Sequence, residues 1–166
     1  MVFLNFYGMN TFFLIKILLF LSTFFLIAFF RKQLANRIRK FKLPEFAAYL
    51  LAAILLIIFE EHINCQPSWC GQIIIPPTLP ILLIEVVIVG LLTRLIKIKR
   101  IFFPVLFYSA FGVTFELLIG GLKGISATGA LFGLFMIIWT GMSYALLVIL
   151  PLTIIIKEGS MPHLYK

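Results

Sequence analysis

The chain has 166 residues, of which 63% are hydrophobic and only 12% charged, and its mean hydropathy is +1.16. An ordinary soluble domain is about 25% charged, so this composition excludes a water-soluble globule. We expect one all-α integral membrane domain over residues 1–166, with the lipid bilayer as its main partner. Fourteen Lys and Arg residues outnumber six acidic residues, giving a formal net charge of +8.

Five apolar segments are candidates for transmembrane helices, because about 20 apolar residues cross roughly 30 Å of hydrocarbon. They cover approximately residues 10–30, 43–59, 73–92, 101–118 and 130–156. The first segment ends in a basic run instead of a small-residue cleavage site, which favours a retained span over a secretory signal. In the third segment three prolines delay the regular helix to about Thr78.

The basic residues predict the orientation of these spans. Most of them fall after the first, third and fifth segments, in stretches that we expect to be loops or tail: Arg31, Lys32, Arg37, Arg39, Lys40, Lys42, Arg94, Lys97, Lys99, Arg100, Lys157 and Lys166. Basic loops remain in the cytoplasm. The pattern predicts an outside N-terminus, an inside C-terminus and location in the cytoplasmic membrane. Beside a span, the run 31–42 is interpreted as an orientation signal near anionic lipid, not as a nucleic-acid site.

Two cysteines, Cys65 and Cys70, follow the second segment on the predicted outer side, where an oxidising compartment permits a disulfide between them. Their spacing is not CxxC, and His62 adds too few ligands for zinc, so we expect no metal site. We also expect no cofactor. The sequence has no nucleotide-binding or dinucleotide-binding motif. It has only two histidines, His62 and His163, and His163 lies in the polar tail, which argues against bis-histidine haem.

Ionisable residues inside the apolar segments are informative, because a charge near the bilayer centre costs at least roughly 2.5–3.5 kcal/mol. They are Lys16, Glu60, Glu61, Glu85 and Glu116. At about 1.5 Å per residue, Lys16, Glu116 and Glu60 lie roughly 22, 24 and 27 Å from the basic ends of their helices. Three helices thus place charge at one level in the outer half of the membrane. His62 lies just beyond that level, and Glu85 lies roughly 10 Å deeper.

These charges have two interpretations. In a structural network, Lys16 would pair with Glu60 or Glu116, while Glu61 and His62 would reach interfacial water. One lysine cannot neutralise several carboxylates, however, so some are expected to carry a proton. Carboxyls of this kind serve proton relays, cation sites and acid–base catalysis. The predicted ion or proton path therefore consists of Glu60, Glu61, His62, Glu85 and Glu116.

Two stripes of small and polar residues predict close packing between the last two segments, because small residues let helices approach. The first contains Ser109, Gly112, Glu116 and Gly120, and the second contains Gly129, Gly133, Thr140 and Tyr144.

Three functions remain open at this point. The first is a small transporter or channel component, which at this length would form a homo-oligomer or join other membrane subunits. The second is an accessory subunit of a larger membrane complex. The third is an intramembrane enzyme acting on a lipid or isoprenoid substrate, with Glu60, Glu61 or Glu116 as general acid and His62 as partner.

Overall fold

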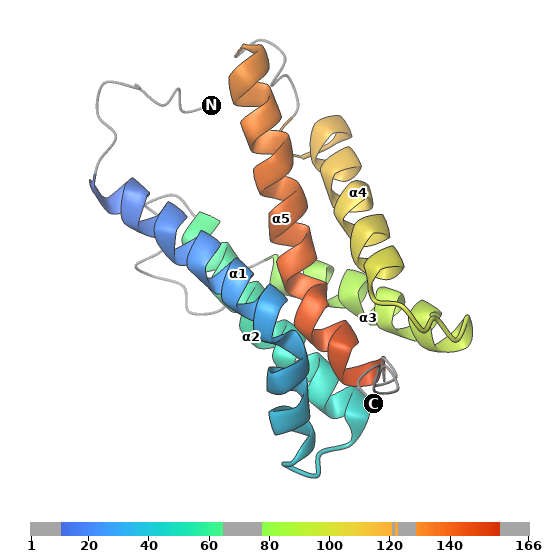
Figure 1. The fold of residues 1–166 in the computed structure, drawn as a ribbon. Coiled ribbons are helices and arrows are strands. Elements are labelled where there is room, and N and C mark those ends of the chain that lie inside the picture. Colours follow the sequence, from blue (N-terminus) through green and yellow to red (C-terminus); the bar gives the residue numbers. More distant parts are fainter. Residues whose placement is uncertain (1–10, 65–77, 121, 123–128, 157–166) are drawn as a thin grey trace, which may run out of the picture.

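The computed structural model describes residues 11–64, 78–120, 122 and 129–156. Within them it contains five α-helices and no strand, so the all-α prediction is confirmed (Figure 1). The helices are α1 (Thr11–Arg39), α2 (Glu45–Asn64), α3 (Leu79–Leu95), α4 (Phe102–Leu118) and α5 (Ala130–Ile155). The predicted late start of the third segment is also confirmed, since α3 begins at Leu79 with Pro80 in its first turn.

Three of these helices are long and apolar enough to cross a membrane. They are α1 from Leu14 onward, α2 and α5, while α4 is a shorter apolar helix. Many large hydrophobic side chains on the helices are exposed, for example Leu18, Phe29 and Leu131 at 63%, 76% and 85%. Their length, composition and exposed apolar surface indicate a membrane protein, since lipid solvates such a surface.

Helix α5 forms the centre of the molecule. It contacts each of the other four helices, with α1 and α2 on one side and α4 on the other (Figure 1). The whole run from Ser143 to Val148 is buried. A helix that is apolar around its full circumference is expected in such a position, because every face meets another helix or lipid.

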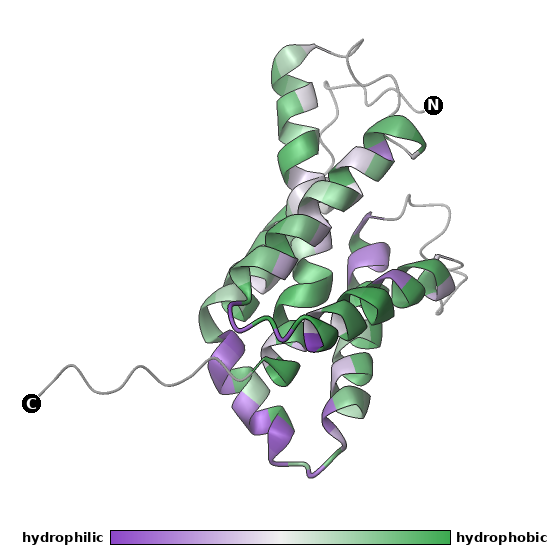
Figure 2. Ribbon diagram, turned by 90° about the vertical axis from the view of Figure 1, so that its right-hand side faces the viewer, coloured by the Kyte–Doolittle hydropathy of each residue, from purple (hydrophilic) through white to green (hydrophobic). Residues whose placement is uncertain are grey.

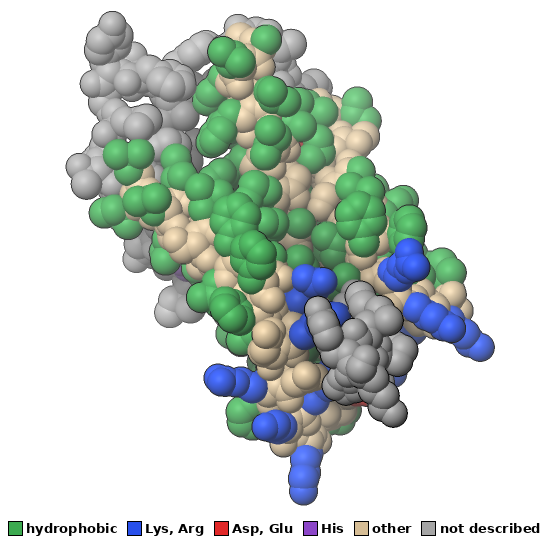
Figure 3. Space-filling view, viewed as in Figure 1, with side chains coloured by type: hydrophobic (Ala, Val, Ile, Leu, Met, Phe, Trp, Pro, Cys, Tyr) green, Lys and Arg blue, Asp and Glu red, His purple; other side chains and the backbone are tan. Residues whose placement is uncertain are grey.

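Basic side chains gather at one end of the molecule. Lys and Arg cluster there in Figure 3, while most side chains of the other described residues on the visible face are hydrophobic. Figure 2 shows the most hydrophilic ribbon at the carboxyl end of α1. The carboxyl ends of α1, α3 and α5 point toward this basic end, as do the amino ends of α2 and α4 (Figures 1 and 3).

The expectation of a loop from Arg31 was wrong, because α1 continues as a helix to Arg39. The reason is an apolar face that persists through the basic run. Ala35 is fully buried, and Leu34 and Ile38 pack against the core. The chain turns only after Arg39, where Lys42 adopts a left-handed backbone with φ 55°.

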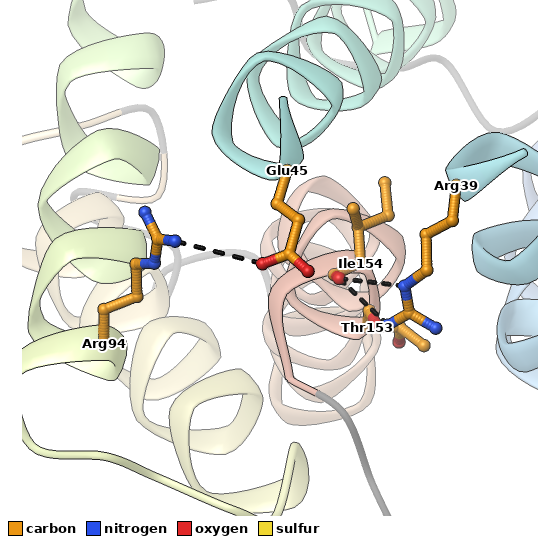
Figure 4. Close-up of polar contacts among 5 residues, drawn as sticks. All are labelled: Arg39, Glu45, Arg94, Thr153 and Ile154. Carbon is orange, nitrogen blue, oxygen red and sulfur yellow. Dashed lines mark hydrogen bonds and ion pairs between the residues drawn. The ribbon is translucent and has the colours of Figure 1, made fainter. Parts of the chain in front are cut away.

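The last turn of α5 is stabilised by Arg39 of α1 (Figure 4). Its Nη2 atom donates to the carbonyls of Thr153 at 2.7 Å and Ile154 at 2.9 Å, and Nε donates to Ile154 at 3.2 Å. The final carbonyls of a helix lack partners within it, and a cation there complements the helix dipole. Helix α5 continues through Pro151 to Ile155.

A tyrosine joins α2 to α3. The Tyr49 hydroxyl donates to the Val86 carbonyl at 2.5 Å and accepts a hydrogen bond from the Gly90 amide. These two backbone groups are i and i+4 partners within α3, so Tyr49 binds one turn of that helix. Gly90 permits this approach, because a Cβ atom there would lie 2.7 Å from Tyr49 Cζ.

Candidate functional site

The first part of the candidate site lies between α2 and α5. Glu60 is only 8% exposed, and its carboxylate accepts hydrogen bonds from Asn64 and Ser143. The side-chain amide nitrogen of Asn64 also lies 3.2 Å from Ser143 Oγ. The side-chain oxygen of Asn64 accepts a 3.0 Å hydrogen bond from Trp139 Nε1. Spacing of four residues brings Glu60 next to Asn64 and Trp139 next to Ser143 on their helices. A buried carboxyl thus receives polar partners from two helices.

The second part joins α3, α4 and α5. The Tyr144 hydroxyl lies 3.4 Å from Glu116 Oε1, and the Tyr108 hydroxyl donates to Glu85 Oε2 at 3.1 Å. The two tyrosine rings pack edge to face, with centroids 5.4 Å apart and planes at 64°. Two carboxyls on different helices are therefore connected through a pair of packed phenols.

Glycines make this second part sterically feasible. Gly112 is buried on α4, and a Cβ atom there would lie 2.2 Å from carbons of the Tyr144 ring. At Gly120, a Cβ atom would lie 2.1 Å from Glu116 Oε2. The two glycines leave room for the ring and for the carboxylate, and the predicted close packing of the last two segments is confirmed by the contacts of α4 with α5.

Neighbouring residues of α5 connect the two parts. Ser143 faces Glu60 of α2 and Tyr144 faces Glu116 of α4. Successive side chains of a helix point about 100° apart, so two consecutive residues of α5 can contact two different neighbouring helices. Glu60 and Glu116 are close enough to interact electrostatically.

The other predicted path residues lie around this core. Glu61 is half-buried, accepts a hydrogen bond from Thr78 and interacts electrostatically with Glu116. His62 places Nδ1 2.7 Å from the Ile58 carbonyl of its own helix. Glu85 is half-buried on α3.

Two further predictions concern the partner of Lys16 and the cysteine pair. Lys16 is half-buried on α1, one turn before Phe20, whose ring packs 4.3 Å from that of Trp139. Pairing of Lys16 with a glutamate stays a prediction. Cys65 and Cys70 lie outside the described residues, so their disulfide also stays a prediction.

Several members of the site were not singled out as functional from the sequence. They are Asn64, Tyr108, Trp139, Ser143 and Tyr144. One signal could have found Asn64, which follows Glu60 by four residues and so shares its helix face. No comparable signal points to Tyr108, because its partner Glu85 is on another helix.

The chemistry available here is that of exchangeable protons. Carboxyls, phenols and a serine hydroxyl can each donate and accept hydrogen bonds, provided that the carboxyl is protonated when it donates. In the part of the chain that the structure describes, no three His, Cys, Asp or Glu side chains converge to hold a metal ion.

Comparison of the chain with protein-family models, with curated proteins and with solved structures finds no match.

Proposed function

We propose that this chain is a membrane transport protein whose intramembrane glutamates carry protons, alone or as a channel or transporter component. One observation carries the proposal. Tyr144 contacts Glu116 and packs on Tyr108, which in turn binds Glu85, so carboxyls of α3 and α4 share one tyrosine pair. Glu60 on α2 extends the set through its electrostatic interaction with Glu116.

The physical basis is the cost of charge in hydrocarbon. An isolated carboxylate inside the membrane is expensive, and either a hydrogen bond or a proton reduces that cost. Tyrosine can receive a proton on one side while releasing one on the other, because its hydroxyl both donates and accepts. In the proposed path a proton moves between Glu116 and Tyr144 and between Tyr108 and Glu85. Ring rotation or an intervening water connects the two tyrosines.

The proposed topology has five spans, an outside N-terminus and an inside C-terminus in the cytoplasmic membrane. The alternating helix directions and the single basic end support it. Helices α3 and α4 have 17 residues each, or about 25 Å, so the bilayer would thin slightly around them. The test is labelling of intact cells with a membrane-impermeant maleimide. Lys99→Cys should be protected in a variant lacking the native cysteines, and native Cys65 should react after reduction.

A proton-flux assay tests the path. The purified chain is reconstituted into liposomes containing a pH-sensitive dye, and flux is driven by a potassium gradient with valinomycin. Glu116→Gln and Glu85→Gln should each lower the rate by about tenfold or more, since general acid–base groups commonly contribute at least that much. Glu45→Gln is the matched control, because Glu45 pairs with Arg94 at 3.9 Å at the basic end, away from the tyrosines. Unchanged flux in both path variants would exclude these carboxyls from transport.

The size of the chain bears on its assembly. With 166 residues, it encloses a path most readily as a homo-oligomer or beside other membrane subunits. Native mass spectrometry after gentle extraction measures this stoichiometry. If the chain alone conducts no protons and co-purifies with other subunits, the flux assay is repeated on that complex with the same variants.

A further inference from the structure

A second polar feature lies at the basic end, apart from the tyrosines and glutamates of the proposed path. A pocket of about 290 Å³ lies between the end of α3, the connection to α4 and the end of α5. Its lining residues are Thr93, Arg94, Lys97, Ile98, Lys99, Ile155 and Ile156. The volume is at the lower end of the roughly 300–1,000 Å³ range of small-ligand sites.

The lining has two chemical sides. Arg94, Lys97 and Lys99 supply positive charge, and Thr93, only 3% exposed, supplies a hydroxyl. The three isoleucines supply an apolar wall. A free anion needs only the first side, whereas a phospholipid offers a charged headgroup joined to an apolar body, which matches both.

Four backbone carbonyls near the pocket already accept hydrogen bonds. The carbonyls of Thr93 and Arg94 at the end of α3 accept hydrogen bonds from the amides of Ile98 and Lys97. At the end of α5, Arg39 occupies the carbonyls of Thr153 and Ile154. Unsatisfied helix carbonyls would repel an anion. These hydrogen bonds reduce that repulsion at four of the carbonyls near the pocket, and the cationic side chains of its lining outweigh what remains.

One acidic side chain faces the pocket's cations. Glu45 at the start of α2 lies 3.9 Å from Arg94, with both side chains substantially exposed (Figure 4). An exposed pair at this distance is weak and exchanges readily with another anion. Glu45 therefore competes with a bound anion for Arg94, while Lys97 and Lys99 supply the other positive charges of the pocket.

Lys97 closes α3 in an ordinary helix-ending turn and brings its side chain to the pocket. Its φ is 55°, in the left-handed region where helix ends usually place Gly or Asn. Here the residue that closes α3 contributes a cation to the pocket. Exposed apolar residues beside it, Leu95 at 76% and Ile96 at 67%, place this turn where the polar surface meets lipid.

We propose that this pocket binds the phosphate of an anionic phospholipid at the basic face of the protein. Basic pockets between transmembrane helices on the cytoplasmic side are suited to such headgroups. The lipid would tie the end of α3 to the end of α5. This binding requires neither the proton path nor its glutamates.

The test compares two lysines with the same backbone conformation. Lys42 and Lys97 both have φ 55°, but only Lys97 lines the pocket. Replacement by glycine removes the side chain and its charge while relieving the left-handed backbone in either case. The full chain in neutral detergent is heated with phosphatidylglycerol, with phosphatidylcholine or with inorganic phosphate, each at equal concentration, and the shift in Tm is recorded.

We expect phosphatidylglycerol to raise the Tm of the unmodified chain clearly more than the other two additives do. Lys97→Gly should lose at least half of that shift, and Lys42→Gly should retain it. Lys99→Gln provides a second pocket variant if Lys97→Gly fails to fold, and Glu45→Gln should enlarge the shift. Equal shifts with phosphatidylcholine, or equal losses in Lys42→Gly and Lys97→Gly, would overturn the proposal. An equal shift with inorganic phosphate would identify a soluble anion and would overturn the lipid assignment.

Discussion

The ring of Tyr144 lies directly against the backbone of Gly112, in space that any larger residue on α4 would occupy. A Cβ atom at Gly112 would come within 2.2 Å of the ring carbons. This contact sets the separation of α4 and α5 and holds the Tyr144 hydroxyl 3.4 Å from Glu116. One glycine thus controls both helix packing and the geometry of the candidate site.

Gly112→Ala should destabilise the protein by about 1–3 kcal/mol, the usual cost of overfilling a packed interior. The buried Tyr144 ring, already packed on Tyr108, has little room to withdraw. Thermal unfolding in detergent, followed by circular dichroism, measures the change.

Gly141→Ala is the matched control for this substitution. A Cβ atom there would lie 3.6 Å from Val113 Cγ2, an ordinary contact. It should leave the Tm unchanged or raise it, because alanine favours helix over glycine. Equal losses in the two variants would contradict the assigned role of Gly112.

Tyr144→Phe should separate the proton path from stability. The substitution preserves the ring against Gly112 and removes the hydroxyl that contacts Glu116. We expect a loss of only about 0.5–1.5 kcal/mol of unfolding free energy, typical of one hydrogen bond, together with a large fall in liposome proton flux. Tyr49→Phe is the control, because the Tyr49 hydroxyl contacts backbone groups. Normal flux in Tyr144→Phe would remove the tyrosine from the path.

The helices follow from the sequence because their information is local. Apolar length, flanking charge and the prolines before Thr78 predict α3 to α5 to within about three residues, whereas α2 continues five residues beyond its predicted end, to Asn64. The end of α1 was missed for a specific reason. Charge in the run after Arg31 suggested a loop, whereas Ala35 and its apolar neighbours keep that run helical by packing.

The candidate site was only partly predictable, because its contacts cross between helices. Rise per residue placed Glu60 and Glu116 at a common depth, and in the structure they contact the consecutive α5 residues Ser143 and Tyr144. The depth of a residue in the membrane does not determine how its helix is rotated about its own axis, and so does not determine which neighbouring helix the side chain faces. The pairing of Tyr108 with Glu85 depends on that rotation, and so does the capping of α5 by Arg39.

Arg39→Gln should destabilise the junction of α1 and α5. It removes the cation that donates to two terminal carbonyls of α5. Hydrogen bonds from a charged group contribute about 1.5–3 kcal/mol, and we expect a loss of unfolding free energy in that range. Arg39→Lys should recover only part of it, because a single ammonium does not reproduce the fork of the guanidinium.

Arg37→Gln provides the control for charge alone, because Arg37 is exposed on the same helix two residues earlier. Its unfolding free energy should change by less than about 0.5 kcal/mol, as for most surface substitutions. Chemical denaturation in mixed micelles measures all three variants. A loss in Arg37→Gln as large as that in Arg39→Gln would show that net charge, and not the cap, stabilises this end.

The contact of Tyr49 with α3 leads to an asymmetric prediction for its two partners. In Tyr49→Phe the Val86 carbonyl and the Gly90 amide lose the hydroxyl, but they can pair with each other as in a regular helix. The loss should stay below about 1.5 kcal/mol, because neither group is left unsatisfied.

Gly90→Ala should cost more, about 1–3 kcal/mol, because the new methyl would overlap a fully packed ring. A Cβ atom at Gly90 would lie 2.7 Å from Tyr49 Cζ, and Tyr49 is completely buried with its ring stacked 5.6 Å from that of Phe46. The ring therefore cannot move aside without disturbing α2. Parallel thermal unfolding of the two variants decides the matter. If Tyr49→Phe loses as much stability as Gly90→Ala, the hydroxyl itself, and not the close approach of the helices, holds α3 to α2.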